Sequence, residues 1–371
     1  MKKILASFML LLALGLSACE SSSDSNNEEQ QQMPEGQGEL SVDRIRIISN
    51  GVDKATFAVT CEGVDVTDSS IFYQSGSSEP LEGNTFSVSV SGDYDFYATY
   101  SDLSTSTVTV TAGPTVSSVP DDPNASSTVF DHTMLLMQFT GTECTYCPTA
   151  ISAIDKILES DEYSSKIEHV AIHSYKNTDP YYNIYAIGLS VYMSPAAYPG
   201  IFFDFDKSSG QYTFMSVDEC YLRLTTLIDE RHTSSPSVGL AAATSIRSSI
   251  ISANIGVKAA VAGEYRVGMM LLENGLYAYQ YGSSGIIEHA NVVRAVAERA
   301  EESDYIGVSV GSLEAGESTS VILDINVDSE WELDNCHLVI YVTALDSDSG
   351  CYVVENVIRC VTEGSVAYQY Q

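Results

Sequence analysis

Two cysteines separated by two residues, Cys144 and Cys147, constrain the fold more than any other part of the chain. Residues 134–139 before them are apolar except for Gln138, as in a β-strand that is buried on both faces. After the pair, apolar residues recur at the spacing of one face of a helix, at Ile151, Ile154 and Ile157. We therefore expect the two sulfurs at a strand-to-helix turn, close enough to form a disulfide.

The segments that follow extend this pattern to residue 236. Residues 167–173 and 201–205 predict two further strands, and a loop with a short helix up to about Ser190 separates them. A turn at 207–210 leads to a short strand at 212–215, and Ser216 and Glu219 form a capping box that opens a last helix. This order, β-α-β-α-β-β-α with the cysteine pair at its first turn, resembles the thioredoxin fold. We expect a thioredoxin-like α/β domain over residues 129–236.

The expected chemistry of the pair is thiol–disulfide exchange. A helix N-terminus stabilises a thiolate, so Cys144 would be the exposed attacking sulfur and Cys147 the resolving one. Pro148 fits the first helical turn, where its missing N–H costs no hydrogen bond. Thioredoxin-like proteins carry a cis-proline facing the dithiol, and the resemblance assigns that role to Pro199, which would shape the substrate groove.

Two side chains depart from an efficient dithiol site, and a third could compensate for them. Gln138 lies where thioredoxins have a buried carboxylate, and an amide cannot move the proton of the resolving cysteine. Glu143 is adjacent to Cys144 and is expected to raise the pKa of its thiol. His173 could relay a proton, although a hydrogen-bonded structural role is more frequent for a lone histidine. These departures argue against strong reductase activity.

Two segments in which apolar and polar residues alternate flank this unit. Residues 40–113 resemble bacterial immunoglobulin-like β-sandwich domains, and residues 237–371 predict another β-sandwich. Residues 114–128 are rich in Pro, Ser and Asp and indicate a linker. The predicted fold class is therefore multidomain, α/β plus all-β, with a thioredoxin-like α/β domain flanked by two β-sandwich domains.

The other cysteines and histidines indicate neither a metal site nor a cofactor. Because exported chains tolerate disulfides, we favour a bridge from Cys336 to either Cys351 or Cys360. His169 and His173 lie four residues apart in a predicted strand, and that spacing separates them by about 13 Å. Such a distance is too long for two ligands of one metal ion.

The N-terminus predicts export and lipid anchoring. Residues 1–18 have the basic start and short apolar run of a lipoprotein signal peptide, which ends before Cys19, the expected lipid-carrying residue. A soluble secreted protein with a chance cysteine at the cleavage site is the alternative. Residues 19–39 are polar and predict a disordered tether, whose acidic, serine-rich start resembles the export signal of surface-displayed lipoproteins. We expect a lipid-anchored protein of the outer membrane, on the cell surface or in the periplasmic leaflet.

Charge narrows the range of partners. The chain has 50 acidic and 17 basic side chains, which give a formal net charge of −33. A surface this acidic repels phosphate backbones, so nucleic acid is excluded as a partner. The expected partners are the membrane, through Cys19, and a protein thiol or disulfide substrate of the cysteine pair.

Longer motifs are similar to those of one family. They are LLMQFTGTECTYCPTA, ENGLYAYQYGSSGIIEHANVVRAVAE and the closing WELDNCHLVIYVTALDSDSGCYVVENVIRC. Over roughly residues 128–371 the chain resembles the Omp-twenty-eight-related family of outer-membrane lipoproteins. The resemblance implies a thioredoxin-like domain followed by a C-terminal β-sandwich, often behind an immunoglobulin-like module, and it leaves the biochemical role open.

Two functions of different classes therefore remain. The first is a thiol–disulfide oxidoreductase of the cell envelope, which the position of the cysteine pair at a strand-to-helix turn favours. The second is a non-enzymatic surface binding or adhesion lipoprotein whose cysteine pair is a structural disulfide. The two sandwich domains, the lipid tether and the missing carboxylate at position 138 are consistent with the second.

Overall fold

The computed structural model describes residues 38–371, with gaps at 102, 234, 248 and 298–304. The predicted signal peptide, the lipid-carrying Cys19 and most of the tether lie outside the described residues. Within the described part, no helix is both long and apolar enough to cross a membrane.

Residues 38–113 form a β-sandwich of two sheets. The first contains β1 (Gly38–Val42), β3 (Ala55–Cys61), β4 (Val64–Asp65) and β6 (Thr85–Phe86). The second contains β2 (Arg46–Ile48), β5 (Ile71–Gln74), β7 (Gly92–Tyr100), β8 (Leu103–Ser104) and β9 (Val108–Gly113). Alternate residues point into a core with the aromatic rings of Phe57, Phe72, Phe86 and Phe96, as period-2 patterning requires.

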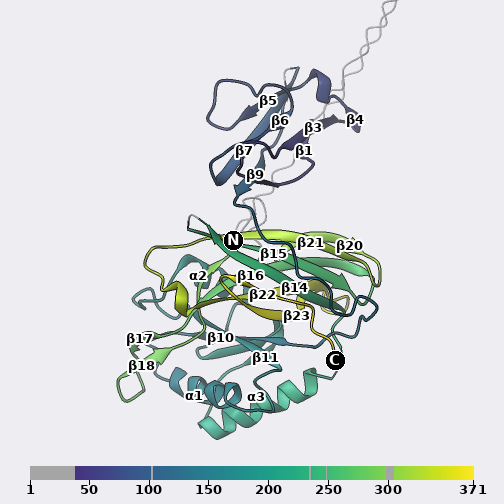
Figure 1. Ribbon diagram of the computed structural model, residues 1–371. Coiled ribbons are helices and arrows are strands. Elements are labelled where there is room, and N and C mark those ends of the chain that lie inside the picture. The colour runs from purple at the N-terminus through teal and green to yellow at the C-terminus, as the bar shows by residue number, and fades with distance from the viewer. Residues whose placement is uncertain (1–37, 102, 234, 248, 298–304) are drawn as a thin grey trace, which may run out of the picture. The chain divides into compact units, whose positions relative to one another are not determined.

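The prediction of a thioredoxin-like α/β domain between two separate sandwiches is wrong. The strands of residues 129–236 are β10 (Met134–Thr140), β11 (Ile167–His173), β12 (Gly200–Phe203) and β13 (Asp206–Gln211). They are one end of a nine-stranded sheet ordered β13-β12-β10-β11-β19-β16-β22-β23, in which β20 also pairs with β16 (Figure 1). The described chain is mostly β, and its three α-helices are α1 (Cys147–Leu158), α2 (Ile184–Met193) and α3 (Val217–Arg231).

The physical reason for this error is a non-local strand pairing. Ala171 of β11 pairs in parallel with Val292 of β19 (Val292–Val296), so the sheet does not end at β11. The sheet continues through β16 (Gly263–Glu273), β20 (Val308–Leu313), β22 (Cys336–Leu345) and β23 (Tyr352–Val361). A hydrophobic run predicts a strand, but it does not say which distant strand pairs with its edge.

A second, four-stranded sheet packs against the later strands of the large one. It contains β14 (Val238–Arg247), β15 (Ile250–Ala259), β21 (Ser318–Asn326) and β24 (Gly364–Val366). Its side chains share one apolar core with those of β16 and β22. A hairpin of β17 (Leu276–Tyr279) and β18 (Ile286–His289) follows β16, and short 3₁₀ helices occur at Thr67–Ser69 and Leu333–Asn335.

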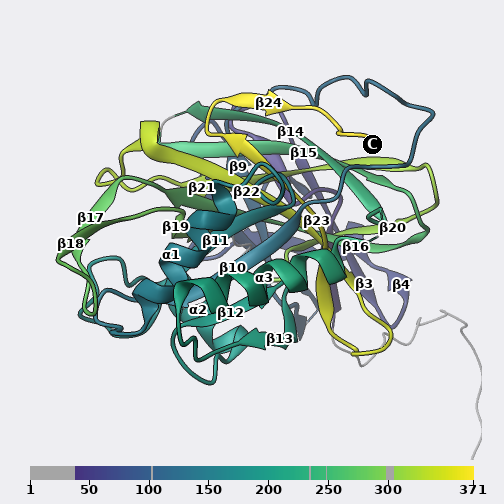
Figure 2. The ribbon, with the colours of Figure 1, turned by 90° about the horizontal axis from the view of Figure 1, so that it is seen from below.

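Helices cover both faces of the large sheet at its β10–β12 end. α1 and α3 lie side by side and pack on Met134 and Leu136 of β10 (Figure 2). α2 packs with Leu135 and Met137, which point to the opposite face of the same strand. Both faces of β10 are therefore buried, as the apolar residues of 134–139 predict.

One local prediction fails at a tight turn. Residues 206–211, where we expected a turn, form β13, and no strand covers 212–215. The chain reverses two residues earlier, at Asp204 and Phe205, which have φ of 53° and 59°. A two-residue hairpin turn of type I′ needs positive φ at both central positions, and Phe205 gives no sequence signal for that conformation.

Capping of α3 by Ser216 is confirmed, although Glu219 bonds Met215 N rather than Ser216 N, and it gives a first testable prediction. Ser216 Oγ accepts a hydrogen bond from Glu219 N at 3.2 Å, and Glu219 Oε2 accepts one from Met215 N at 3.1 Å. We expect Ser216→Ala to lower the free energy of unfolding by about 1 kcal/mol, measured by urea denaturation. The exposed Ser165→Ala is the matched control, and equal losses in the two variants would contradict the assignment.

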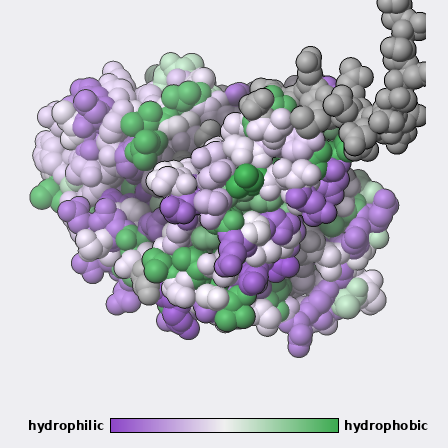
Figure 3. Space-filling view, turned by 90° about the horizontal axis from the view of Figure 1, so that it is seen from above, coloured by the Kyte–Doolittle hydropathy of each residue, from purple (hydrophilic) through white to green (hydrophobic). Residues whose placement is uncertain are grey.

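The surface seen in Figure 3 mixes polar and apolar side chains. On this face the apolar residues form small groups separated by polar ones. Large contiguous apolar patches are what usually mark protein-docking surfaces. This face therefore gives no reason to look for a site on it, whereas several titratable side chains are buried inside the molecule.

Candidate functional site

The cysteine pair lies between β10 and α1 and is oxidised. Cys144 and Cys147 form a disulfide, as expected for two sulfurs at this spacing. A hydrogen bond from Cys144 N to Gly141 O at 3.0 Å holds the turn, and α1 begins at Cys147 with Pro148 in its first turn. The predicted strand-to-helix turn is therefore confirmed.

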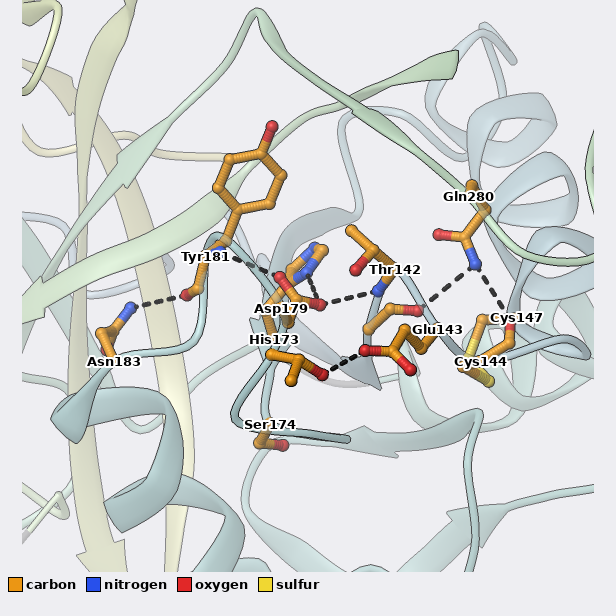
Figure 4. A network of polar contacts seen from close by, with 12 residues as sticks. Thr142, Glu143, Cys144, Cys147, His173, Ser174, Asp179, Tyr181, Asn183 and Gln280 are labelled. Atoms are coloured by element: carbon orange, nitrogen blue, oxygen red, sulfur yellow. Dashed lines mark hydrogen bonds and ion pairs between the residues drawn. A yellow bond between two sulfur atoms is a disulfide. The ribbon is translucent and has the colours of Figure 1, made fainter. Parts of the chain in front are cut away.

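Both sulfur-bearing residues are buried, so the prediction of an exposed Cys144 is wrong. Cys144 is 2% exposed and Cys147 is 0% exposed. Residues 280–285, which we call the covering loop, join β17 to β18 and lie against the backbone of the cysteine turn, where Gln280 is seen in Figure 4. Gln280 is itself fully buried and donates hydrogen bonds from Nε2 to Cys144 O at 2.9 Å and Gly141 O at 3.3 Å.

The backbone of the covering loop lies equally close to the cysteine turn. Tyr281 N donates a hydrogen bond to Thr142 O at 2.8 Å. Gly282 has a φ of 79°, and a Cβ added there would lie 2.0 Å from Thr145 O. Only glycine fits this contact, because a side chain would collide with backbone that cannot move aside.

The Tyr198–Pro199 peptide bond is cis, which confirms the expected isomer. Gly200, the next residue, pairs with Phe139 near the end of β10, so Pro199 lies at the same end of the sheet as the disulfide. Tyr198 is held by its hydroxyl, which lies 2.9 Å from Ser174 Oγ and 3.0 Å from Ser190 Oγ. The role of Pro199 in shaping a substrate groove stays a prediction.

His173 is hydrogen-bonded to a buried carboxylate that the sequence analysis missed. His173 Nδ1 lies 2.9 Å from Asp179 Oδ2, and that oxygen also accepts a hydrogen bond from Thr142 N at 2.6 Å (Figure 4). Burial acts to raise the pKa of Asp179, but the hydrogen bonds from His173, Thr142 and Tyr181 lower it below its ordinary value. Asp179 thus ties the loops after β10 and β11 together, six residues after His173 and without any motif to mark it.

Glu143, expected to raise the pKa of Cys144, is itself hydrogen-bonded to neighbouring side chains. Its carboxylate accepts hydrogen bonds from Thr178 Oγ1 and, at 3.0 Å, from Lys176 Nζ. These bonds, the one from Thr178 first, lower the pKa of Glu143. Its negative charge is therefore compensated by a neighbouring lysine.

The predicted bridge from Cys336 to Cys351 or Cys360 is wrong. All three thiols are free, with Cys351 exposed and the other two buried. Cys360 pairs with Leu338 in the sheet, and Cys336 Sγ instead donates to Glu332 O at 3.4 Å. Burial raises the pKa of Cys336 to about 12, which makes it an unreactive core thiol.

The described residues contain no group of three or more His, Cys, Asp or Glu side chains that could hold a metal ion. His169 and His173 do point to the same face of β11, but their ring nitrogens have different partners, Gln138 and Asn291 for His169 and Asp179 for His173. The arrangement supports hydrogen bonding rather than coordination.

The fold and site define a mostly β protein with a buried disulfide at the edge of a helix-covered sheet. No protein-family model matches the chain, and no curated protein matches it. The resemblance to Omp-twenty-eight-related lipoproteins therefore stays a prediction.

Some solved structures are similar to the structure of this chain. HBP35 of Porphyromonas gingivalis matches with a TM-score of 0.52 and 15% identity, over 62% of this chain and 76% of that one. A protein of Agrobacterium tumefaciens matches with a TM-score of 0.39 and 13% identity, over 63% of this chain and 96% of that one. The first likeness supports the fold alone, and the second carries no argument.

Proposed function

We propose that this protein is a lipid-anchored binding protein of the cell envelope whose Cys144–Cys147 disulfide is structural. The observation that carries the proposal is the burial of both cysteines, 2% exposed at Cys144 and 0% at Cys147, in a turn whose carbonyl groups Gln280 of the covering loop bonds. The anchor is supported by sequence, through the signal peptide at residues 1–18 and the lipid-carrying position Cys19.

Thiol–disulfide exchange requires direct access to a sulfur. An attacking thiolate must approach one sulfur of the bond and displace the other as the leaving thiolate. Here Cys144 is 2% and Cys147 is 0% exposed, and the covering loop is hydrogen-bonded to the backbone of the cysteine turn through Gln280 and Tyr281. In addition, Gln138 offers an amide where proton transfer to the leaving sulfur would need an acid.

A thiol–disulfide oxidoreductase is the competing function. It is favoured by the cis Tyr198–Pro199 bond, which lies at the same end of the sheet as the disulfide. In that case Cys144 would be the nucleophile, Cys147 the resolving thiol, and a protein disulfide the substrate. The two functions predict different reduction potentials for the Cys144–Cys147 disulfide.

The reduction potential of the Cys144–Cys147 pair therefore tests the proposal. We expect a value below about −300 mV, because structural disulfides resist reduction by glutathione, and we expect no insulin reduction by the full chain. A potential between about −270 and −120 mV, with activity that Cys144→Ser abolishes, would establish the oxidoreductase instead.

A further inference from the structure

A polar cavity of about 280 Å³ lies under α1, on the face of the sheet next to the disulfide. Its floor follows from strand geometry, because residues two apart in a strand share a face. On β10 the face that begins with the apolar Met134 and Leu136 continues with Gln138 and Thr140. On β11 the same face carries His169 and His173, while the end of β18 adds His289 and the turn after it adds Asn291.

Four polar atoms of this floor have no hydrogen-bond partner among the described residues. They are Gln138 Nε2, Thr140 Oγ1, His173 Nε2 and His289 Nε2. All four side chains are more than nine-tenths buried and line the cavity. Buried polar atoms in proteins are nearly always hydrogen-bonded, so four that converge on one cavity indicate a bound polar molecule.

The hydrogen bonds behind the floor define what two of these atoms can do. Asn291 Nδ2 donates to His169 Nδ1 at 3.2 Å, and His169 Nε2 donates to Gln138 Oε1 at 3.1 Å. Gln138 therefore presents only N–H donors to the cavity. His173 Nδ1 donates to Asp179, so in the neutral form of the ring Nε2 presents a lone pair, which is an acceptor.

The charge of the lining excludes anions. The lining contains Asp155 and Glu288 and neither lysine nor arginine, so a phosphate or carboxylate would be repelled. An ammonium group would satisfy His173 but would leave the N–H groups of Gln138 without an acceptor. A hydroxyl group can both accept from Gln138 and donate to His173.

We propose that this cavity binds a small neutral polyhydroxyl compound, such as one sugar ring or a polyol. Neighbouring hydroxyl groups of such a ligand pair with Gln138, Thr140, His173 and His289. Ile151 and Leu158 of α1 complete the lining and offer apolar contact to the C–H face of a ring. The volume is at the lower end of ligand pockets and fits one ring, either a free monosaccharide or the terminal residue of a glycan.

This inference rests on the proposed function, because it names the class of ligand that the proposed binding protein would bind. The reduction potential of the disulfide is measured separately. A redox-active cysteine pair would therefore overturn the proposed structural disulfide and leave the proposed ligand site unaffected. Absence of sugar binding would overturn the ligand site and leave the structural disulfide unaffected.

The test is ligand-observed NMR and calorimetry on the full chain with D-glucose, D-galactose, D-mannose, myo-inositol and maltotriose. We expect at least one of these compounds to bind with millimolar or tighter affinity. Binding of maltotriose would indicate that the cavity takes the terminal residue of a glycan as well as a free monosaccharide. Thr140→Val removes one unpartnered hydroxyl without adding a polar group, and it should weaken binding about threefold to tenfold. Ser245→Ala is the matched control, because Ser245 Oγ is also buried and unpartnered in the described chain but lies outside the cavity lining.

Three results would overturn the proposal. The first is no binding by any of the five compounds at 10 mM, on the order of the weakest useful affinity. The second is equal binding by wild type and Thr140→Val. The third is preferential binding of inorganic phosphate or ethanolamine that Thr140→Val weakens, since this would assign the cavity to a charged ligand.

Discussion

Replacing Gln280 by alanine is expected to accelerate reduction of the Cys144–Cys147 disulfide by about 100-fold. The Gln280 side chain donates to Gly141 O, Cys144 O and Tyr281 O, all inside the molecule. Its removal deletes the three hydrogen bonds that this side chain makes, at about 1 kcal/mol each, which destabilises the closed covering loop by about 3 kcal/mol. If the loop must open before a thiol can reach Cys144, the rate rises with the open fraction, and each 1.4 kcal/mol corresponds to about tenfold.

The measurement is the rate of reduction by dithiothreitol, with acid quenching, alkylation and mass spectrometry of the two cysteines. Ser284→Ala is the matched control, because it changes an exposed side chain in the same loop. Urea unfolding of both variants distinguishes local opening of the loop from a loss of global stability. A Gln280→Ala rate equal to that of wild type would show that the loop does not limit access to the disulfide.

Local features of this fold could be predicted from sequence. The run at residues 134–139 gave β10, the capping residues Ser216 and Glu219 gave the start of α3, and the position of Pro199 before a strand gave the cis bond. Each depends on neighbours a few residues away, through side-chain period, capping or turn chemistry. These local patterns can therefore be recognised in a single sequence.

Non-local contacts could not be predicted in the same way. Gln280 lies 136 residues from Cys144, and nothing in its neighbourhood indicates which carbonyl groups it will satisfy. The pairing of Ala171 with Val292 likewise joins two segments that each look like ordinary strands. The fold-class error and the error about the exposure of Cys144 have this one origin.

The polar cavity was partly visible in the sequence. Gln138 and His173 were singled out, but as departures from a dithiol mechanism rather than as two members of one polar face. The period-2 geometry of β10 and β11 places them, with Thr140 and His169, on the same side of the sheet. His289 comes from the strand after the covering loop, and only the folded chain brings it to this face.

Acidification is expected to destabilise the protein through histidines that are buried in neutral form. Burial lowers the pKa of His169 to about 3, of His289 to about 4 and of His337 to about 3. An unfolded histidine titrates near pH 6.5, so below this pH the unfolded chain binds protons that the folded chain does not. Stability then rises with pH in this range, and each histidine removes about 2 kcal/mol between pH 7.5 and pH 5.

Asp204 opposes this trend. It is partly buried after β12, and burial, only partly offset by the hydrogen bond from Leu135 N, raises its pKa to about 7. The folded chain therefore takes up a proton at Asp204 as the pH falls below 7, whereas the unfolded aspartate stays ionised until about pH 4. This uptake contributes about 3 kcal/mol of stability between pH 7.5 and pH 5.

Two variants separate these opposing contributions. His337 is 4% exposed and neither ring nitrogen has a hydrogen-bond partner among the described residues, so His337→Leu removes a buried polar group as well as a titrating one. We expect it to be more stable than wild type by about 1–3 kcal/mol at pH 7.5 and by about 2 kcal/mol more at pH 5. Asp204→Asn keeps the acceptor for Leu135 N and tolerates the positive φ, but it loses the proton uptake.

Asp204→Asn should therefore lose about 3 kcal/mol more than wild type when the pH falls from 7.5 to 5. Urea denaturation of the three proteins at both pH values measures these differences directly, with the m value as a check that the unfolding transition is the same. If His337→Leu and wild type lose equal stability over this pH range, His337 is not held neutral in the folded chain. If Asp204→Asn follows wild type, the Asp204 carboxyl is already ionised at pH 5, and its contact with Leu135 N outweighs its burial.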